Sequence, residues 1–111
     1  MGRASREKGK RGEREFAQIL RDLGFQAERT VQYCGRNGTS DVSSSLDGVH
    51  IEVKRYARIA ALRFMEQAVR DCPSSDLPVV AMREDHGEWM IMIRVKDLPG
   101  LATKFVEGRE T

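Results

Sequence analysis

Three residues in the middle of the chain, Asp41, Glu52 and Lys54, have the types and spacing of a site for phosphate-ester chemistry. Hard divalent cations such as Mg²⁺ prefer carboxylate and carbonyl oxygens, so the two acids and the backbone carbonyl of Val53 are candidate metal ligands. Lys54 follows Glu52 by two positions, which on a strand places both side chains on one face. An ammonium there can orient an attacking water or neutralise charge that develops on a phosphate. The pattern therefore points to metal-dependent phosphodiester hydrolysis.

A tight hairpin is the element that would bring these side chains together. Asp47-Gly48 favours a two-residue turn with positive φ at both central positions, which fixes the register of the flanking strands. In that register Asp41 lies directly opposite Lys54 and shares its face with Glu52, with Cβ atoms roughly 5–8 Å apart. A simple cross-strand ion pair between Asp41 and Lys54 fits the same spacing. The other face of the hairpin is apolar and is expected to face the core; it carries Val42, Leu46, Val49, Ile51 and Val53.

The pattern of apolar residues predicts eight elements in all. We expect helices at residues 12–23, 59–72 and 97–107, and strands at residues 25–31, 41–46, 49–54, 77–82 and 88–95. This order predicts an α/β fold with a central five-stranded mixed β-sheet flanked by helices. The helix at 59–72 is expected to bury Ile59, Leu62, Met65 and Val69. Met90 and Met92 are expected either at a subunit interface or under the protein's own helix.

Charge is distributed unevenly along the chain. The 111 residues suit one domain, and 19 basic against 17 acidic residues give a net charge of only +2, which does not by itself argue for nucleic acid. Residues 1–11 hold five basic side chains against Glu7 alone. We expect these residues to form a flexible basic arm ahead of a single domain at residues 12–111. Such an arm fits both nucleic-acid binding and a solvated tail.

Cysteine content and hydropathy indicate the compartment. Cys34 and Cys72 form neither a disulfide framework nor a zinc spacing, which is typical of reduced thiols in a cytosolic protein. No apolar run reaches the length of a membrane span, and no signal peptide precedes the basic N-terminus. We therefore expect a cytoplasmic protein without a membrane partner.

Two parts of the sequence resemble known nucleases. Asp41 followed by Glu52-Val53-Lys54 is similar to the PD-(D/E)xK nuclease motif, with Ser40 at the variable position of the motif's proline. The run Lys10-Arg11-Gly12-Glu13-Arg14-Glu15-Phe16, with Gly24-Phe25 downstream, resembles the opening of archaeal-type Holliday junction resolvases, which also occur in phages. The resemblance implies a restriction-endonuclease-like core and a homodimeric endonuclease that cuts four-way DNA junctions by paired symmetric incisions.

The resemblance also implies roles for individual residues. Asp41 and Glu52 would hold Mg²⁺, for which Mn²⁺ can substitute, and Lys54 would assist the attacking water or the transition state. Glu13 would complete the acidic site as a catalytic residue and a further metal ligand, although a surface carboxylate at a helix N-terminus fits its position as well. Gln67 is an accessory candidate, and His50 is expected to be a surface strand residue without a role.

Basic side chains are the expected DNA contacts, through backbone phosphates. They are Arg3, Arg6, Lys8, Lys10, Arg11, Arg36 and Arg55. The glycine-punctuated loop at residues 32–40 fits either close approach to a phosphate or an ordinary connector. The same motif also serves repair, nicking and restriction-type endonucleases, and a non-catalytic DNA-binding module with a vestigial site is a third reading. A phage-encoded enzyme would act in the host cytoplasm.

Overall fold

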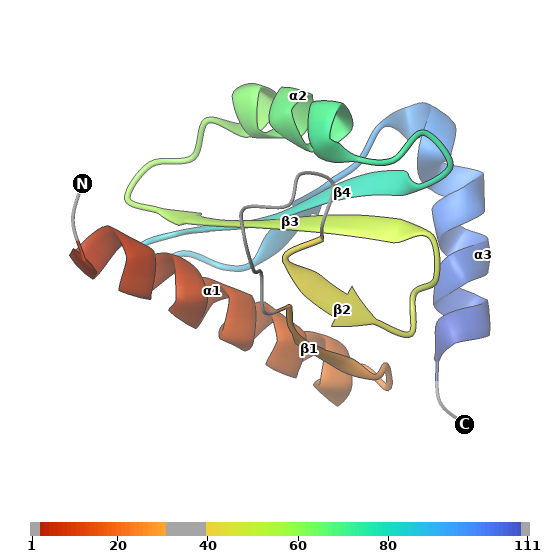
Figure 1. Cartoon of the computed structure of the whole chain (residues 1–111), viewed down its shortest axis with the longest axis horizontal. Coiled ribbons are helices and arrows are strands. Elements are labelled where there is room, and N and C mark those ends of the chain that lie inside the picture. Colours follow the sequence, from red (N-terminus) through yellow and green to blue (C-terminus); the bar gives the residue numbers. More distant parts are fainter. Residues whose placement is uncertain (1–2, 31–39, 110–111) are drawn as a thin grey trace.

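The computed structural model describes residues 3–30 and 40–109 (Figure 1). Its elements in chain order are α1 (Arg3–Asp22), β1 (Ala27–Arg29), β2 (Val42–Ser44), β3 (Val49–Tyr56), α2 (Ala61–Asp71), β4 (Leu77–Glu84), β5 (Met90–Met92), the short 3-10 helix η1 (Val95–Asp97) and α3 (Leu98–Gly108). All eight predicted elements are present in the predicted order, so the α/β class is confirmed.

Two helices cover the two faces of a central sheet. β3 and β4 run parallel and are joined by the crossover helix α2, while β5 is antiparallel to β4. α1 packs on one face of this sheet and α2 on the other, and α3 stands at one end (Figure 1). The prediction of a mixed sheet is confirmed. A single five-stranded sheet is not observed, because the strands of the described residues form a β3-β4-β5 sheet and a separate β1-β2 ribbon.

The hairpin ladder between β2 and β3 is absent because two side chains take its place. Ile51 N donates to Ser40 Oγ at 2.8 Å and Val53 N donates to Asp41 Oδ2 at 2.8 Å, so β3 bonds to side chains where backbone carbonyls were expected. The turn contributes as well. Gly48 has a φ of +78°, but Asp47 is not among the residues with positive φ, so the turn is not the type that keeps two strands paired. β2 pairs with β1 instead.

The predicted register of Asp41 is therefore wrong. Asp41 N donates to Ile51 O at 2.7 Å, and its carboxylate reaches Val53 N, so Asp41 lies beside the Ile51–Val53 stretch of β3 rather than opposite Lys54. The new position still leaves Asp41 next to Glu52, because their carboxyl groups are hydrogen-bonded. The observed register differs from the predicted one, but Asp41 and Glu52 are adjacent in both.

The first helix also begins earlier than predicted, at Arg3 rather than at residue 12. Residues 3–11 contain good helix formers and no proline, and these continue the helix through Gly9. Lys8 Nζ lies 2.7 Å from Asp85 Oδ1, which ties this part of α1 to the turn after β4. The residues predicted as an arm are thus helical from Arg3 onward, while residues 1–2 lie outside the described structure.

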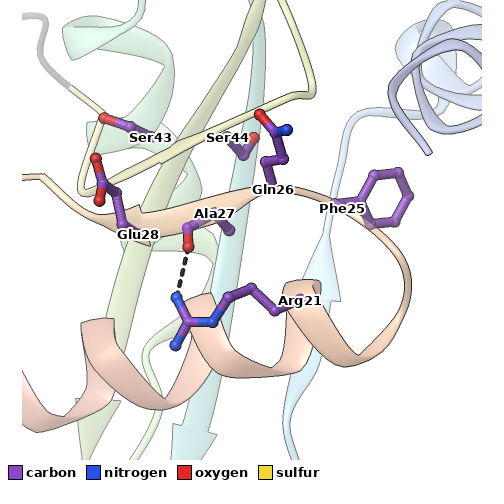
Figure 2. A pocket seen from close by; sticks show the side chains of 7 residues that line it. All are labelled: Arg21, Phe25, Gln26, Ala27, Glu28, Ser43 and Ser44. Carbon is purple, nitrogen blue, oxygen red and sulfur yellow. Dashed lines mark hydrogen bonds between the residues drawn. The ribbon is translucent and has the colours of Figure 1, made fainter. Parts of the chain in front are cut away.

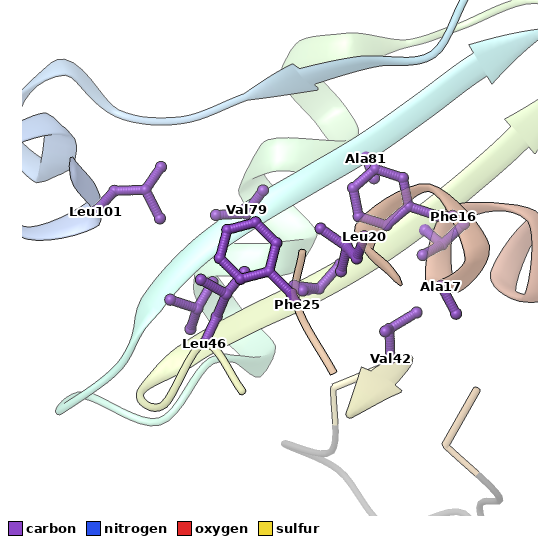
Figure 3. Close-up of a cluster of buried hydrophobic side chains, with 12 residues drawn as sticks. Phe16, Ala17, Leu20, Phe25, Val42, Leu46, Val79, Ala81 and Leu101 are labelled. Atoms are coloured by element: carbon purple, nitrogen blue, oxygen red, sulfur yellow. The ribbon is translucent and has the colours of Figure 1, made fainter. Parts of the chain in front are cut away.

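The main core lies between α1, the sheet and α3 (Figure 3). It contains the five hairpin residues that were predicted to face inward, all of them buried, which confirms that prediction. A second cluster lies under α2, where Met65 and Ala68 pack on Val80. The predicted stripe of α2 is only partly correct, since Leu62 is 72% exposed. Met92 packs against this second cluster, as the own-helix alternative predicts.

Among the residues that the structure describes, no helix is long and apolar enough to cross a membrane. Cys72 is a free thiol, and Cys34 lies outside the described residues.

Candidate active site

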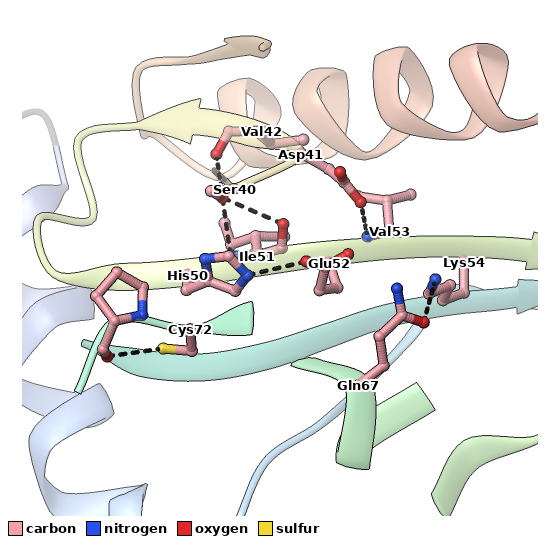
Figure 4. A network of polar contacts seen from close by, with 11 residues as sticks. Ser40, Asp41, Val42, His50, Ile51, Glu52, Val53, Lys54, Gln67 and Cys72 are labelled. Atoms are coloured by element: carbon pink, nitrogen blue, oxygen red, sulfur yellow. Dashed lines mark hydrogen bonds and ion pairs between the residues drawn. The ribbon is translucent and has the colours of Figure 1, made fainter. Parts of the chain in front are cut away.

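Asp41 is fixed to the edge of β3 through both its backbone and its side chain (Figure 4). Its N–H donates to Ile51 O and its carboxylate accepts from Val53 N. Ser40 adds a third attachment: its hydroxyl accepts from Ile51 N and lies 2.8 Å from Val42 O and 3.1 Å from Ile51 O. A proline at position 40 would lack this hydroxyl. The serine at the motif's variable position therefore holds Asp41 in place.

The carboxyl groups of Asp41 and Glu52 form a close acidic pair. Glu52 is 6% exposed, and a hydrogen bond joins it to Asp41. Burial raises the pKa of Asp41 from 3.8 to about 7, and the negative charge of Glu52 acts in the same direction. A buried carboxylate beside a second acid is stabilised by a nearby positive charge, so the pair suits a divalent cation.

The donor set suits a hard cation with many water ligands. No three His, Cys, Asp or Glu side chains within residues 3–30 and 40–109 are grouped closely enough to hold a metal by themselves. Mg²⁺ keeps several waters and takes one or two protein carboxylates together with substrate phosphate, which is what Asp41 and Glu52 offer. In an extended strand the N–H and C=O of one residue point to the same edge, so the Val53 carbonyl lies on the side where its amide binds Asp41.

Glu13 approaches this pair from α1. Its carboxylate accepts a bond from Arg29 Nε at 2.8 Å, which anchors it to β1. Burial raises the pKa of Glu13, Arg29 opposes that rise, and the charge of Glu52 adds to it. Glu13 is thus a part-buried carboxylate within electrostatic range of Glu52, not a freely solvated surface group. Its ion pair with Arg29 neutralises it in the metal-free protein.

Lys54 is oriented by α2, on the opposite side of β3 from α1. Its Nζ donates to Gln67 Oε1 at 2.9 Å and lies 5.4 Å from the centre of the Phe64 ring (Figure 4). The ring contributes a cation–π attraction and the amide a directed acceptor. Gln67, named from the sequence as an accessory residue, contacts the lysine directly. Phe64 was not foreseen, because periodicity assigns it only to the apolar side of the helix.

His50 is the residue whose role the sequence reasoning missed. It is 1% exposed, and its Nε2 lies 2.9 Å from Glu52 Oε1. The expectation of a surface position is wrong because β3 is covered on both faces by α1 and α2. One signal was present: strand alternation places His50 on the same face as Glu52 and Lys54. Its contact restricts the orientation of the Glu52 carboxylate.

The predicted DNA contacts fall into two groups. Arg3, Arg6 and Arg11 are exposed on α1. The remaining described ones are engaged: Lys8 with Asp85, Lys10 with Glu7 at 3.8 Å, and Arg55 with Glu15 at 3.2 Å. Arg36 lies outside the described residues, as does the loop at 32–40 except for Ser40.

A surface depression of about 570 Å³ lies where the end of α1 meets the β1-β2 ribbon (Figure 2). It is lined by Arg21, Phe25, Gln26, Ala27, Glu28, Ser43 and Ser44. Arg21 is bonded to the backbone carbonyl of Ala27 and so belongs to the wall. None of the acidic or lysine site residues lines this depression, which separates it from the candidate active site.

Comparison with known families agrees with this geometry. A family described as "Phage putative PDDEXK endonuclease" has a model that matches residues 4–107. The chain belongs to this PDDEXK endonuclease family. The matched range includes Asp41 and Glu52-Val53-Lys54, and membership of the family makes the protein a nuclease. Among curated proteins, no match was found.

Proposed function

We propose that this PDDEXK endonuclease resolves four-way DNA junctions by metal-dependent hydrolysis, as a homodimer that makes paired symmetric incisions in the host cytoplasm. The observation that carries the hydrolytic part is the bonded pair of Asp41 and Glu52 beside the Val53 amide, with Lys54 two residues along the same strand. Selectivity for junctions is supported by the resemblance of residues 10–16 and their surroundings to the resolvases.

Each residue has a task that follows from its contacts. A bound Mg²⁺ would polarise the scissile phosphoryl group and lower the pKa of a coordinated water. Asp41 and Glu52 would hold that ion. Ser40 fixes the chain beside Asp41 to β3, and His50 restricts the Glu52 carboxylate. The Lys54 ammonium, steered by Gln67, faces the charge that develops on the phosphate.

A homodimer presents two equivalent sites to a substrate that is itself two-fold, so symmetric cuts follow from symmetry. The proposed contact face is the exposed apolar surface at β5 and the start of α3. Its large side chains are Met90, Ile91, Val95 and Leu98, which are 61%, 46%, 85% and 55% exposed.

The test compares a synthetic four-way junction with a linear duplex of the same sequence over a Mg²⁺ titration. Wild type should cut the junction at paired positions and leave the duplex largely intact. Asp41→Asn, Glu52→Gln and Lys54→Ala should bind the junction but fail to cut it, whereas Asp47→Asn, in the exposed turn, should cut like wild type. Robust cutting by all three site variants would refute the assignment.

Other outcomes select the rival functions. Equal cutting of both substrates, or cutting of the duplex alone, indicates a repair, nicking or restriction-type endonuclease on the same fold. Tight binding without cleavage of branched, single-stranded or duplex DNA, in Mg²⁺ or Mn²⁺, indicates a non-catalytic DNA-binding module.

A further inference from the structure

A second, basic pocket lies between α1 and β3. It has a volume of about 320 Å³ and is lined by Arg11, Arg14, Glu15 and Arg55. The three α1 residues are spaced i, i+3 and i+4, which places them on one side of the helix. Glu13 is turned about 160° from both Arg11 and Glu15, so it belongs to a different side. The pocket is thus separate from the acidic site, although Arg55 directly follows Lys54 on β3.

The charges of this pocket do not cancel. Glu15 Oε1 lies 3.2 Å from Arg55 Nε, and Glu15 Oε2 accepts from Arg83 Nη1 at 2.9 Å, so two guanidinium groups already neutralise that single carboxylate. The lining side chains are three arginines and one glutamate, a formal charge of +2. Within the described part of the chain, Arg11 and Arg14 form no hydrogen bond or ion pair. The side chains that line the pocket therefore carry an excess of positive charge.

One buried donor in the pocket is also unsatisfied. Arg55 Nε and Glu15 Oε1 are both buried, and neither has a hydrogen-bond partner in the described structure despite their ion-pair distance. Buried polar atoms normally have a partner, from the protein, from water or from a ligand. The close packing at Gly12 keeps Arg55 in this place, since a Cβ on Gly12 would lie 3.0 Å from the Arg55 Cβ.

We infer that this pocket binds a non-scissile phosphate of the DNA backbone, an inference that rests on the proposed nuclease function. A phosphodiester carries one negative charge and acceptor oxygens that match guanidinium forks. The Glu15 network alone explains Arg55 and Arg83, because it fastens α1 to the sheet. It does not explain Arg11 and Arg14, which line the same pocket and form no ion pair within the described residues.

The test measures DNA binding against salt concentration, in a Glu52→Gln background that does not cut. Arg14→Ala removes an exposed side chain that forms no hydrogen bond or ion pair within the described residues, so the fold should be retained. Loss of one phosphate contact lowers the slope of log affinity against log salt by about 0.9. Raising salt from about 50 to about 200 mM should then weaken the parent about 3.5-fold more than Arg14→Ala. Arg14→Lys should keep the slope, because a point charge remains.

Arg109→Ala is the matched control, since Arg109 is an exposed arginine just after α3, at the far end of the molecule from the start of α1 (Figure 1). It should show the slope of the parent. An unchanged slope in Arg14→Ala, or an equal decrease in both variants, would overturn the inference. The two proposals can fail separately: a wild type that cuts DNA while Arg14→Ala keeps the parental slope refutes only the pocket. A protein that never cuts, but whose slope falls with Arg14→Ala, refutes only the nuclease.

Discussion

Replacing Asp41 with asparagine should stabilise the metal-free protein while it removes the chemistry. An asparagine keeps both contacts of the native side chain: its oxygen can accept from Val53 N and its amide can donate to Glu52. It removes the negative charge that is held next to another buried carboxylate. The Asp41 charge is thus expected to lower the stability of the folded protein while it serves the reaction.

The size and sign of the effect follow from the pKa of Asp41. That pKa rises from 3.8 in its ordinary state to about 7 in the folded protein. The folded state therefore binds more protons than the unfolded state between these values, and stability falls as pH rises through this window. Above about pH 7 the full cost applies, which at about 1.4 kcal/mol per pH unit amounts to about 4 kcal/mol. The Asp41→Asn variant escapes this cost, since an asparagine side chain carries no titratable proton.

The assay is urea unfolding in the presence of a chelator. At about pH 8 the free energy of unfolding of Asp41→Asn should exceed that of wild type by up to about 4 kcal/mol, and at about pH 4 the two should nearly coincide. Asp47→Asn, an exposed carboxylate in a turn, should stay within about 0.5 kcal/mol of wild type at both pH values. Added Mg²⁺ should stabilise wild type and narrow the gap, because a ligand stabilises the state that binds it. A variant no more stable than wild type at high pH, or a gain that is equal at both pH values, would refute the reasoning.

Two further predictions concern the residues that hold the site. Ser40→Ala removes the acceptor of Ile51 N and should lower the free energy of unfolding by about 1–3 kcal/mol. It should also raise the Mg²⁺ concentration needed for half-maximal cleavage. Ser43→Ala, which removes an exposed hydroxyl nearby, should leave that concentration unchanged. An identical Mg²⁺ requirement in Ser40→Ala and wild type would contradict this role. Gln67→Ala frees the Lys54 ammonium and should lower the single-turnover cleavage rate on the order of tenfold at unchanged DNA affinity; a rate equal to that of wild type would exclude a role for Gln67 in orienting the lysine.

Much of the site could be predicted because strand alternation is a strong local signal. Alternation alone places Glu52 and Lys54 on one face of β3 and the apolar residues on the other, and the structure buries those apolar residues as expected. The pairing of β2 could not be predicted in the same way. It depends on whether a β3 amide bonds to a backbone carbonyl or to the side chains of Ser40 and Asp41, and that choice is made by tertiary packing.

The errors at His50 and at the start of α1 have a common physical origin. Both depend on what packs against an element, which the element's own sequence does not state. His50 is polar but lies under α2, where Glu52 satisfies it. Gly12 looks like a helix boundary, yet it is the point where α1 comes close to Arg55 on β3. A glycine at a close helix–strand contact and a glycine at a helix end have the same appearance in a sequence.

The most direct test of the central claim measures DNA cleavage by wild type and Glu52→Gln as Mg²⁺ is added to chelator-treated protein. We expect no cleavage by wild type without the ion, cleavage that rises to saturation with Mg²⁺, and no cleavage by Glu52→Gln at any concentration, although the variant folds and binds DNA. Cleavage by wild type that is indifferent to Mg²⁺ and other divalent cations, or undiminished cleavage by Glu52→Gln, would contradict the account.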